Sequence, residues 1–273
     1  QRTAVCCLSS LNIDTYDQWS EDPQFIEDVM RFLDNVMTDF INRAPDEFAH
    51  AKYSAMRERS VGLGVMGLHS YFQQKNIPFG SVMSKVWNKK IFKNIQEKVD
   101  LASVSLAEER GACPDAAEYG MKERFSNKTA IAPTASISII CGGSSPGIEP
   151  IAANSYTHKT LSGSFNVRNK YLKKILQKYK KDTDDVWSTI TTNQGSVAHL
   201  DFLTPDEKDT FKTAFEIDQR WIVELGADRT PHISQAQSIN IFIPADIHKK
   251  DLHDLHFQAW KKGLKSLYYC RSK

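Results

Sequence analysis

The stretch from Asn127 to Pro150 (NKTAIAPTASISIICGGSSPGIEP) has the residue types of an anion-binding loop. Its apolar run, Thr129 to Ala132, is typical of a buried strand, and Pro133 ends that run because proline has no N–H for a ladder. Small and hydroxyl residues follow, up to Ser138, and free backbone N–H groups at such a helix start can bind phosphate. On spacing alone, a strand–turn–helix connection without a ligand remains the simpler alternative.

Five cysteines offer thiol chemistry: Cys6, Cys7, Cys113, Cys141 and Cys270. Their odd number and the absence of a C-x-x-C pair favour reduced thiols over a disulfide framework, and they indicate no zinc site. Cys6 and Cys7 lie in an apolar run that predicts a strand, so their side chains should point to opposite faces. Taken singly, each is most simply a small inert core residue. Tyr268-Tyr269 would likewise be core residues by composition alone.

Gly62, Gly64 and Gly67 match the dinucleotide pattern G-x-G-x-x-G letter for letter. That fingerprint also requires an acidic residue about 20 positions later and a helix directly after the glycines. No Asp or Glu occurs between Gly67 and Glu97, and the segment that should be helical contains Pro78 and Gly80. We therefore favour close packing of a strand backbone against its neighbours over nicotinamide binding.

The amino-acid composition is that of an ordinary globular protein. The 273 residues are 41% hydrophobic and 25% charged with a net charge of +2, so nothing points to nucleic acid or a membrane surface. No apolar run approaches the length of a membrane span, and we expect no signal peptide. The basic segment 169–181 is predicted to be a solvated helix face, and His248, His253 and His256 are assigned to the surface. Because the first residue is Gln1, we expect a processed or truncated piece of a longer chain.

Strands are predicted to alternate with helices along the chain. The predicted strands are 3–9, 60–68, 128–132, 238–243 and 266–270, and the predicted helices are 20–44, 85–110, 169–181, 204–225 and 251–262, with 156–168 irregular. This order predicts a parallel sheet with right-handed crossovers, either an open α/β sheet or half of a large barrel. Ligands bind at the carboxyl ends of such strands, where we expect Cys6, residues 133–138 and the tyrosine pair.

Six segments together resemble one family, the large catalytic subunit of class I ribonucleotide reductase, over its C-terminal half. They are AVCCLSSLN (4–12), VGLGVMGL (61–68), ERGACP (109–114), APTASISIICGGSSPGIEP (132–150), YTHKTLSGSF (156–165) and LYYC (267–270). The resemblance implies an α/β fold, the second half (five strands with crossover helices) of a ten-stranded barrel. It implies one domain over 1–273 with helical insertions at about 169–226.

The resemblance assigns roles to particular residues. Cys6 falls on a redox-active barrel cysteine, whereas Cys7 occupies a position where the family needs no cysteine. The substrate diphosphate loop falls on Pro133, Thr134, Ala135, Ser136 and Ile137. Many members have a hydroxyl residue in place of Ile137, so backbone N–H groups should carry more of the contact, with Ser138 as a substitute. Tyr268 and Tyr269 fall on the tyrosine pair that relays a radical, which cobalamin-dependent relatives lack. No metal ligands are implied.

The same resemblance implies parts that are absent from the sequence. The Asn-x-Cys-x-Glu finger loop, the first redox cysteine and the effector sites belong to an N-terminal half, and no C-terminal cysteine pair precedes Lys273. We therefore expect a ribonucleoside-diphosphate reductase that is active only when completed by that half and by the small subunit. The chain itself would bind no cofactor and would rely on a di-iron or dimanganese tyrosyl-radical small subunit.

Further partners are implied in the same way. They are a ribonucleoside diphosphate substrate, thioredoxin or glutaredoxin as reductant, and an alpha2beta2 assembly, with no nucleic acid and no membrane. The expected location is the cytoplasm, or the host cytoplasm for a phage-type split subunit. Two other hypotheses remain open: a stand-alone nicotinamide oxidoreductase using Gly62, Gly64 and Gly67, and a non-catalytic scaffold that binds the small subunit.

Overall fold

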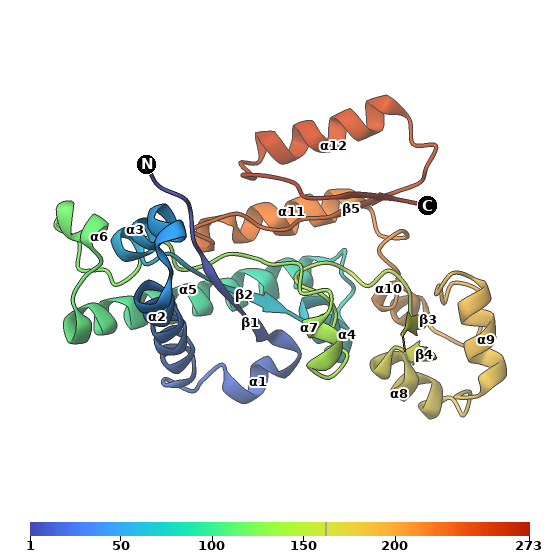
Figure 1. Cartoon of the computed structure of the whole chain (residues 1–273). Helices are drawn as coiled ribbons and strands as arrows, with labels where there is room; N and C mark the ends of the chain where they lie inside the picture. Colours follow the sequence, from blue (N-terminus) through green and yellow to red (C-terminus); the bar gives the residue numbers. More distant parts are fainter. Residues whose placement is uncertain (162) are drawn as a thin grey trace.

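The computed structural model describes residues 1–161 and 163–273 (Figure 1). Its strands are β1 (Cys7–Asn12), β2 (Val61–Met66), β3 (Ser155–Thr160), β4 (Gly163–Arg168), β5 (Ile241–Ile243) and β6 (Cys270–Ser272). Its α-helices are α1 (Tyr16–Trp19), α2 (Phe25–Arg43), α3 (Ala49–Glu58), α4 (Leu68–Gln74), α5 (Val82–Arg110), α6 (Pro114–Glu118), α7 (Ile137–Ile140), α8 (Lys170–Lys178), α9 (Asp184–Thr192), α10 (Pro205–Thr210), α11 (Gln219–Arg229) and α12 (Lys249–Lys261). None of these helices is long and apolar enough to cross a membrane.

Five extended segments run parallel to one another. β1 pairs with β2 from Cys7 opposite Val61 onward, and β5 pairs with β6. Between these two pairs, parallel bridges join Leu63 to Thr129 and Ile131 to Gln237. The backbone N–H of Ile241 donates to the carbonyl of Tyr269 over 3.0 Å. The predicted succession of five parallel strands is therefore confirmed, with the third formed by bridges around 129–131.

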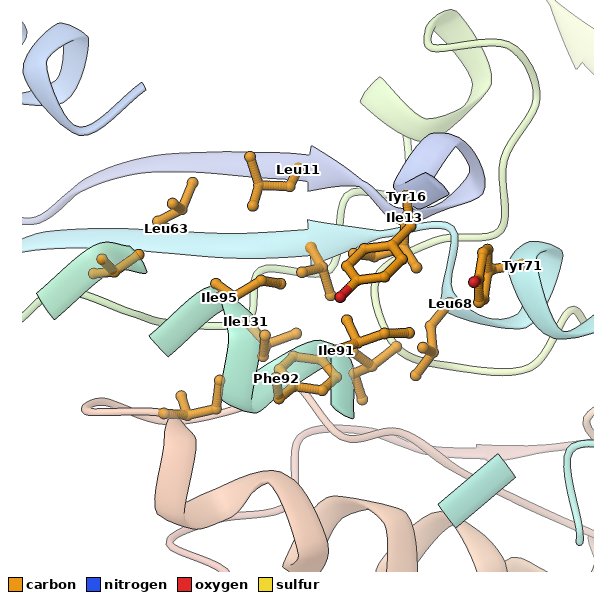
Figure 2. Packing of buried hydrophobic residues seen from close by; sticks show 14 of the residues in the cluster. Leu11, Ile13, Tyr16, Leu63, Leu68, Tyr71, Ile91, Phe92, Ile95 and Ile131 are labelled. Atoms are coloured by element: carbon orange, nitrogen blue, oxygen red, sulfur yellow. The ribbon is translucent and has the colours of Figure 1, made fainter. Parts of the chain in front are cut away.

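One face of these strands is covered by helices, and the main hydrophobic core lies there. α5 packs against α2 on one side and against α11 on the other. Figure 2 shows Ile91, Phe92 and Ile95 of α5 among Leu63 and Ile131 of the strands. Full burial of each such side chain stabilises the fold by about 1.5–3 kcal/mol. The helix-covered face of the sheet therefore carries the hydrophobic core that stabilises the fold.

The opposite face carries small residues. A Cβ at Gly64 would lie 2.2 Å from the carbonyl oxygen of Ala130, and a Cβ at Gly62 would lie 2.9 Å from the Ala130 Cβ. Neither position tolerates a side chain, so the close-packing interpretation of the glycine pattern is confirmed. The expectation that no helix follows was wrong, because Gly67 turns the chain with φ +81° directly into α4. Gly62 and Gly64 nevertheless lie inside β2 and not in a phosphate-binding turn.

Residues from about 155 to 211 form a second packed unit beside the main body (Figure 1). It consists of the antiparallel hairpin β3–β4 together with α8, α9 and α10, and its own core contains Tyr171, Trp187 and Phe211. The hairpin replaces the irregular segment predicted for 156–168. Residues along β4 do not alternate between buried and exposed positions. The sequence therefore lacks the two-residue hydrophobic pattern that would have indicated a strand.

Several predicted boundaries in the first half were wrong. β1 begins at Cys7 and runs to Asn12, not from 3 to 9. α2 begins at Phe25 because Asp22 accepts the N–H of Gln24 over 2.8 Å and turns the chain before the helix. Phe32 lies on α2 but is 61% exposed, although it is a large apolar residue. α3 was not predicted.

The second half shows one major correction. The predicted helix start at 204 is confirmed, because Thr204 and Glu207 form a capping box with Pro205 at the first helical position. The helix it begins ends at Thr210 and does not reach 225, since a separate helix, α11, starts at Gln219 with Asp218 as its cap. The last strand is likewise displaced, because β6 begins at Cys270 and leaves the two tyrosines before it.

A buried ion cluster fastens α2 to the segments around it. Asp34 is fully buried and accepts hydrogen bonds from Arg59 (2.9 Å), Arg110 (2.8 Å) and Arg124 (2.9 Å). Burial alone would raise the pKa of Asp34, but the hydrogen bonds from Arg124 and Arg110 outweigh it, so the pKa is lowered. The carboxylate is thus ionised in the folded protein and neutralises part of the guanidinium charge.

Replacing Asp34 by asparagine should lower the free energy of unfolding by about 3–5 kcal/mol, because three guanidinium groups lose their buried counter-charge. Urea unfolding measures this change. Asp39→Asn removes a carboxylate from an exposed pair with Arg43 and should cost less than about 1 kcal/mol. Because the folded pKa of Asp34 is depressed, its contribution is present above the unfolded pKa of about 3.9 and is lost as the pH falls through the folded pKa. Equal costs for both variants would contradict the role of the cluster.

Candidate active site

Cys6 lies directly before β1, on the face of the sheet that lacks helices. Its Sγ accepts a hydrogen bond from Gln235 Nε2 over 3.4 Å, and the side chain is exposed. A Cβ at Gly62 would lie 3.1 Å from this sulfur, so the glycine leaves room for it. Cys7 points the other way and packs against the main core, as alternation predicted. Burial raises the pKa of the Cys7 thiol, which lowers the fraction of reactive thiolate at this residue.

The segment after Ile131 forms a tight loop with unpaired donors. Thr134 has φ +52°, is buried, and accepts the N–H of Gly147 at its Oγ1 over 2.7 Å. Within the described residues, the backbone N–H groups of Ala135, Ser136 and Ile137 have no hydrogen-bond partner. Three successive unpaired N–H groups on exposed residues at the start of α7 form a donor surface suited to an anion.

Ser138 does not contribute to that donor surface. Its side chain is 1% exposed, and its N–H donates to the Thr134 carbonyl over 3.0 Å. The expectation that Ser138 substitutes for a hydroxyl at position 137 was therefore wrong, because the first turn of α7 directs Ser138 inward. Ile137 is exposed and has no polar side-chain atom, so its N–H, which has no partner in the described residues, is the group that can bind an anion.

A polar network that the sequence did not reveal supports the loop from below. Asn12, at the end of β1, donates through Nδ2 to the Cys141 carbonyl over 3.1 Å. The Ser144 hydroxyl donates to Asn12 Oδ1 (3.1 Å) and Asp14 Oδ2 (3.2 Å), and Lys170 pairs with the same Asp14 carboxylate. The loop is therefore fixed to β1 and α8, which no local sequence pattern could have indicated.

Tyr268 and Tyr269 lie side by side ahead of β6. Their ring centroids are 4.1 Å apart at an interplanar angle of 49°, and both side chains are about half exposed. The Tyr269 phenol raises the pKa of Tyr268. The guanidinium of Arg271 lies 5.5 Å from the Tyr269 ring centroid. When one of two phenols in contact is oxidised to a radical, the other can donate an electron to it, so a radical can move from one ring to the other.

A buried carboxyl group links the tyrosine pair to the segment that follows the loop. Glu149 Oε2 accepts from Asn240 Nδ2 over 2.7 Å, and Asn240 Oδ1 accepts the N–H of Tyr269 over 3.0 Å. Burial raises the pKa of Glu149. Sequence reasoning missed both residues. The Glu in Gly147-Ile148-Glu149-Pro150, an acid between apolar and rigid residues, was the available signal.

These contacts bring only some of the predicted residues together. Ala130 lies over Gly62 beside the Cys6 sulfur, and Pro133 follows about 10 Å further along an extended chain. Cys6 itself lies at the amino end of β1, so its predicted position at the carboxyl ends was wrong, because the strand starts later than expected. In the described residues no hydrogen bond or ring contact joins either tyrosine to Cys6, and no His, Cys, Asp and Glu cluster is placed to hold a metal.

The fold and site define an α/β protein whose parallel strands carry an exposed thiol, a loop with unpaired backbone N–H groups and a pair of tyrosines in contact. The sequence matches the model of the family described as ribonucleotide reductase, barrel domain, over residues 1–123 and 114–270. The chain therefore belongs to this family, and its predicted fold class is confirmed.

Known relatives agree with this assignment. The chain is 50% identical to the ribonucleoside-diphosphate reductase large subunit of Invertebrate iridescent virus 6, over 100% of the chain and 29% of the relative. It is 42% identical to a putative large subunit of Frog virus 3 (99% and 48%). The class Id ribonucleotide reductase alpha subunit of Actinobacillus ureae superposes with a TM-score of 0.93 at 39% identity, over 100% of the chain and 50% of that protein. The chain thus spans half or less of these relatives.

Proposed function

We propose that this chain is the C-terminal part of a ribonucleoside-diphosphate reductase large subunit. In this proposal it contributes Cys6 as a redox-active cysteine, Pro133, Thr134, Ala135, Ser136 and Ile137 as the substrate diphosphate loop, and Tyr268 and Tyr269 as radical-transfer residues. The three unpaired N–H groups of the loop, which follows the strand segment whose Ala130 lies near the Cys6 thiol, are the observation that supports it most directly. Residues 1–273 would form one domain, with the unit around α8 to α10 as an insertion.

The thiol has a simple chemical role in this scheme. Cys6 and a second cysteine outside this chain would each give up a proton and an electron and form a disulfide. The two electrons and two protons would convert a ribose C–OH into C–H and release water. A dithiol protein such as thioredoxin or glutaredoxin would then reduce the disulfide. The exposure of Cys6 makes its sulfur accessible to both reactions.

The tyrosine pair would pass the radical between a small subunit and the chemistry at the ribose. A phenol can lose an electron and a proton together, and the two rings are in contact. The metal-bound radical source would belong to that small subunit, with di-iron or dimanganese chemistry. An N-terminal half would supply the initiating cysteine and the effector sites, in an alpha2beta2 assembly in the cytoplasm.

A complementation assay tests the function as a whole. The chain is mixed with the N-terminal half of the large subunit, a class I small subunit and a dithiol reductant, and deoxyribonucleotide formation is measured. We expect activity only with all components present. Absence of activity in the complete mixture, with each component folded, would reject the assignment. Activity without the small subunit would reject the relay.

The diphosphate loop can be tested on the chain alone. Inorganic pyrophosphate added to ¹⁵N-labelled protein should shift the amide signals of Ala135, Ser136 and Ile137. Thr134→Ala removes the acceptor of the Gly147 N–H and should weaken binding about tenfold, because a buried hydrogen bond that shapes the loop is lost. Thr134→Ser keeps the hydroxyl and should bind normally.

The same titration separates the alternatives. A non-catalytic scaffold predicts no pyrophosphate shifts at the loop. A nicotinamide oxidoreductase predicts that NAD shifts the amides of Gly62, Gly64 and Gly67. We expect neither result, because the strand position of Gly62 and Gly64 leaves no phosphate-binding turn there.

A further inference from the structure

A cavity of about 340 Å³ lies at the junction between the main body and the unit around α8. Its walls come from α4, α7, the segment from 143 to 154, the hairpin β3–β4 and the start of α8. Cys6, Gly62 and Gly64 do not line it, so it is separate from the open face of the sheet. Its volume is within the range of small-molecule sites, which often form where two packed units meet.

Gln73 provides an unused hydrogen-bond donor in this cavity. The residue is 2% exposed and lines the cavity wall. Its Oε1 accepts from Asn169 Nδ2 over 2.9 Å, but its Nε2 has no partner in the described part of the chain. A buried donor without a partner costs about 1–3 kcal/mol, so an acceptor placed in the cavity would be favoured.

The other lining residues restrict the charge of a ligand. Lys170 is paired with Asp14, and Arg168 donates to Asp184 over 2.7 Å, so both lining cations in the described structure are already neutralised. Apolar walls from Ile139, Ile151 and Val167 face the remaining space. The chemistry that fits is an uncharged molecule with apolar faces and a carbonyl oxygen or ring nitrogen as acceptor.

We propose that this junction cavity, lined by Gln73, binds an uncharged heterocycle of the nucleobase or nucleoside type. Gln73 Nε2 donates to the heterocycle, and the aliphatic walls cover its faces. Ala135 and Ser138 also line the cavity, so the ligand contacts the back of the loop that carries the free N–H groups. Ala135 belongs both to this cavity and to the proposed diphosphate loop, but no cavity contact involves Cys6 or the tyrosine pair, so the probes below are chosen to distinguish the two sites.

The test follows the Gln73 side-chain amide by ¹⁵N–¹H NMR, its signal assigned by its loss in Gln73→Leu. Uridine and adenosine are the probes, and ribose 5-phosphate is the probe without a base. We expect saturable shifts of the Gln73 amide with at least one nucleoside and none with ribose 5-phosphate. Equilibrium dialysis should show binding weakened at least about tenfold in Gln73→Leu. Gln177→Leu, which removes an exposed amide of α8 that donates to Asp182 and does not line the cavity, should bind normally.

A second variant keeps the test decisive if the buried Gln73→Leu change disturbs folding. Ala152 is exposed and lines the cavity, so Ala152→Trp should fill its mouth and abolish binding with an unchanged circular dichroism spectrum. No saturable shift with either nucleoside would overturn the proposal, as would binding that survives Ala152→Trp. Loss of the Gln73 shift under saturating pyrophosphate would also overturn it, because the nucleoside would then occupy the loop and not the cavity.

Discussion

Cys6→Ser should reduce turnover by more than about a thousandfold in the reductase assembled from this chain, the N-terminal half and the small subunit. A serine hydroxyl cannot form a disulfide, so the two electrons for the ribose have no source, and effects of this order are usual when a covalently reacting residue is removed. The fold should be unaffected, since Cys6 is exposed and serine can still accept the hydrogen bond from Gln235. Steady-state deoxyribonucleotide formation measures the change.

Cys7→Ser is the matched control for this substitution. Cys7 is the neighbouring thiol, but it packs against the helix-covered core, and burial raises its pKa. We expect normal turnover with a stability loss of about 1–3 kcal/mol from placing a hydroxyl in a partly apolar site. Full activity of Cys6→Ser would remove Cys6 from the mechanism. Loss of activity only in Cys7→Ser would transfer the role to Cys7.

Tyr268→Phe should abolish radical transfer, and Tyr269→Phe should do the same. Phenylalanine keeps the ring contact at 4.1 Å but has no phenol to lose a proton with the electron. A drop of more than about a hundredfold in turnover is expected, the scale of losing a group that acts only in the reaction. Both side chains are about half exposed, so neither substitution should change the unfolding midpoint measurably.

Tyr119→Phe is the corresponding control for the loss of a phenol. Tyr119 is 84% exposed at the end of α6 and contacts no other ring in the described structure. Its substitution should leave turnover unchanged. A spectroscopic measurement extends the test: with either relay tyrosine replaced, the small-subunit radical should persist when substrate is added. Radical decay at the normal rate in Tyr268→Phe would contradict the proposed path.

The linear order of the polypeptide was sufficient to predict the parallel strands and several helix ends. Apolar runs at 61–66 and 129–131, with the capping residues Thr204 and Gly111, carry local signals that depend on neighbours within a few residues. The glycine pattern was also interpretable, because Gly64 leaves no space for a side chain. The predicted ends of helices and strands were wrong where a turn depends on a side-chain hydrogen bond, as at Asp22 before α2.

Predictions from local composition were wrong wherever the packing or hydrogen-bonding partner of a segment lay far along the chain. The hairpin β3–β4 and the break between α10 and α11 are stabilised by a second core, which no single window of sequence contains. The same holds for Asp34, whose three arginines are 25 to 90 positions away. Burial then reverses what residue type suggests, because Phe32 is exposed while Asp34 is not.

The sequence by itself determined the family resemblance, the thiol at Cys6, the loop at 133–137 and the tyrosine pair, because these depend on residue type and order. Only the tertiary structure decided how they are arranged. It placed Cys6 at the amino end of β1, left three N–H groups of the loop unpaired, and tied Tyr269 to Glu149 through Asn240. It also formed the cavity at Gln73. The physical reason is that hydrogen-bond satisfaction and burial are properties of packed segments, and residues distant in sequence supply them.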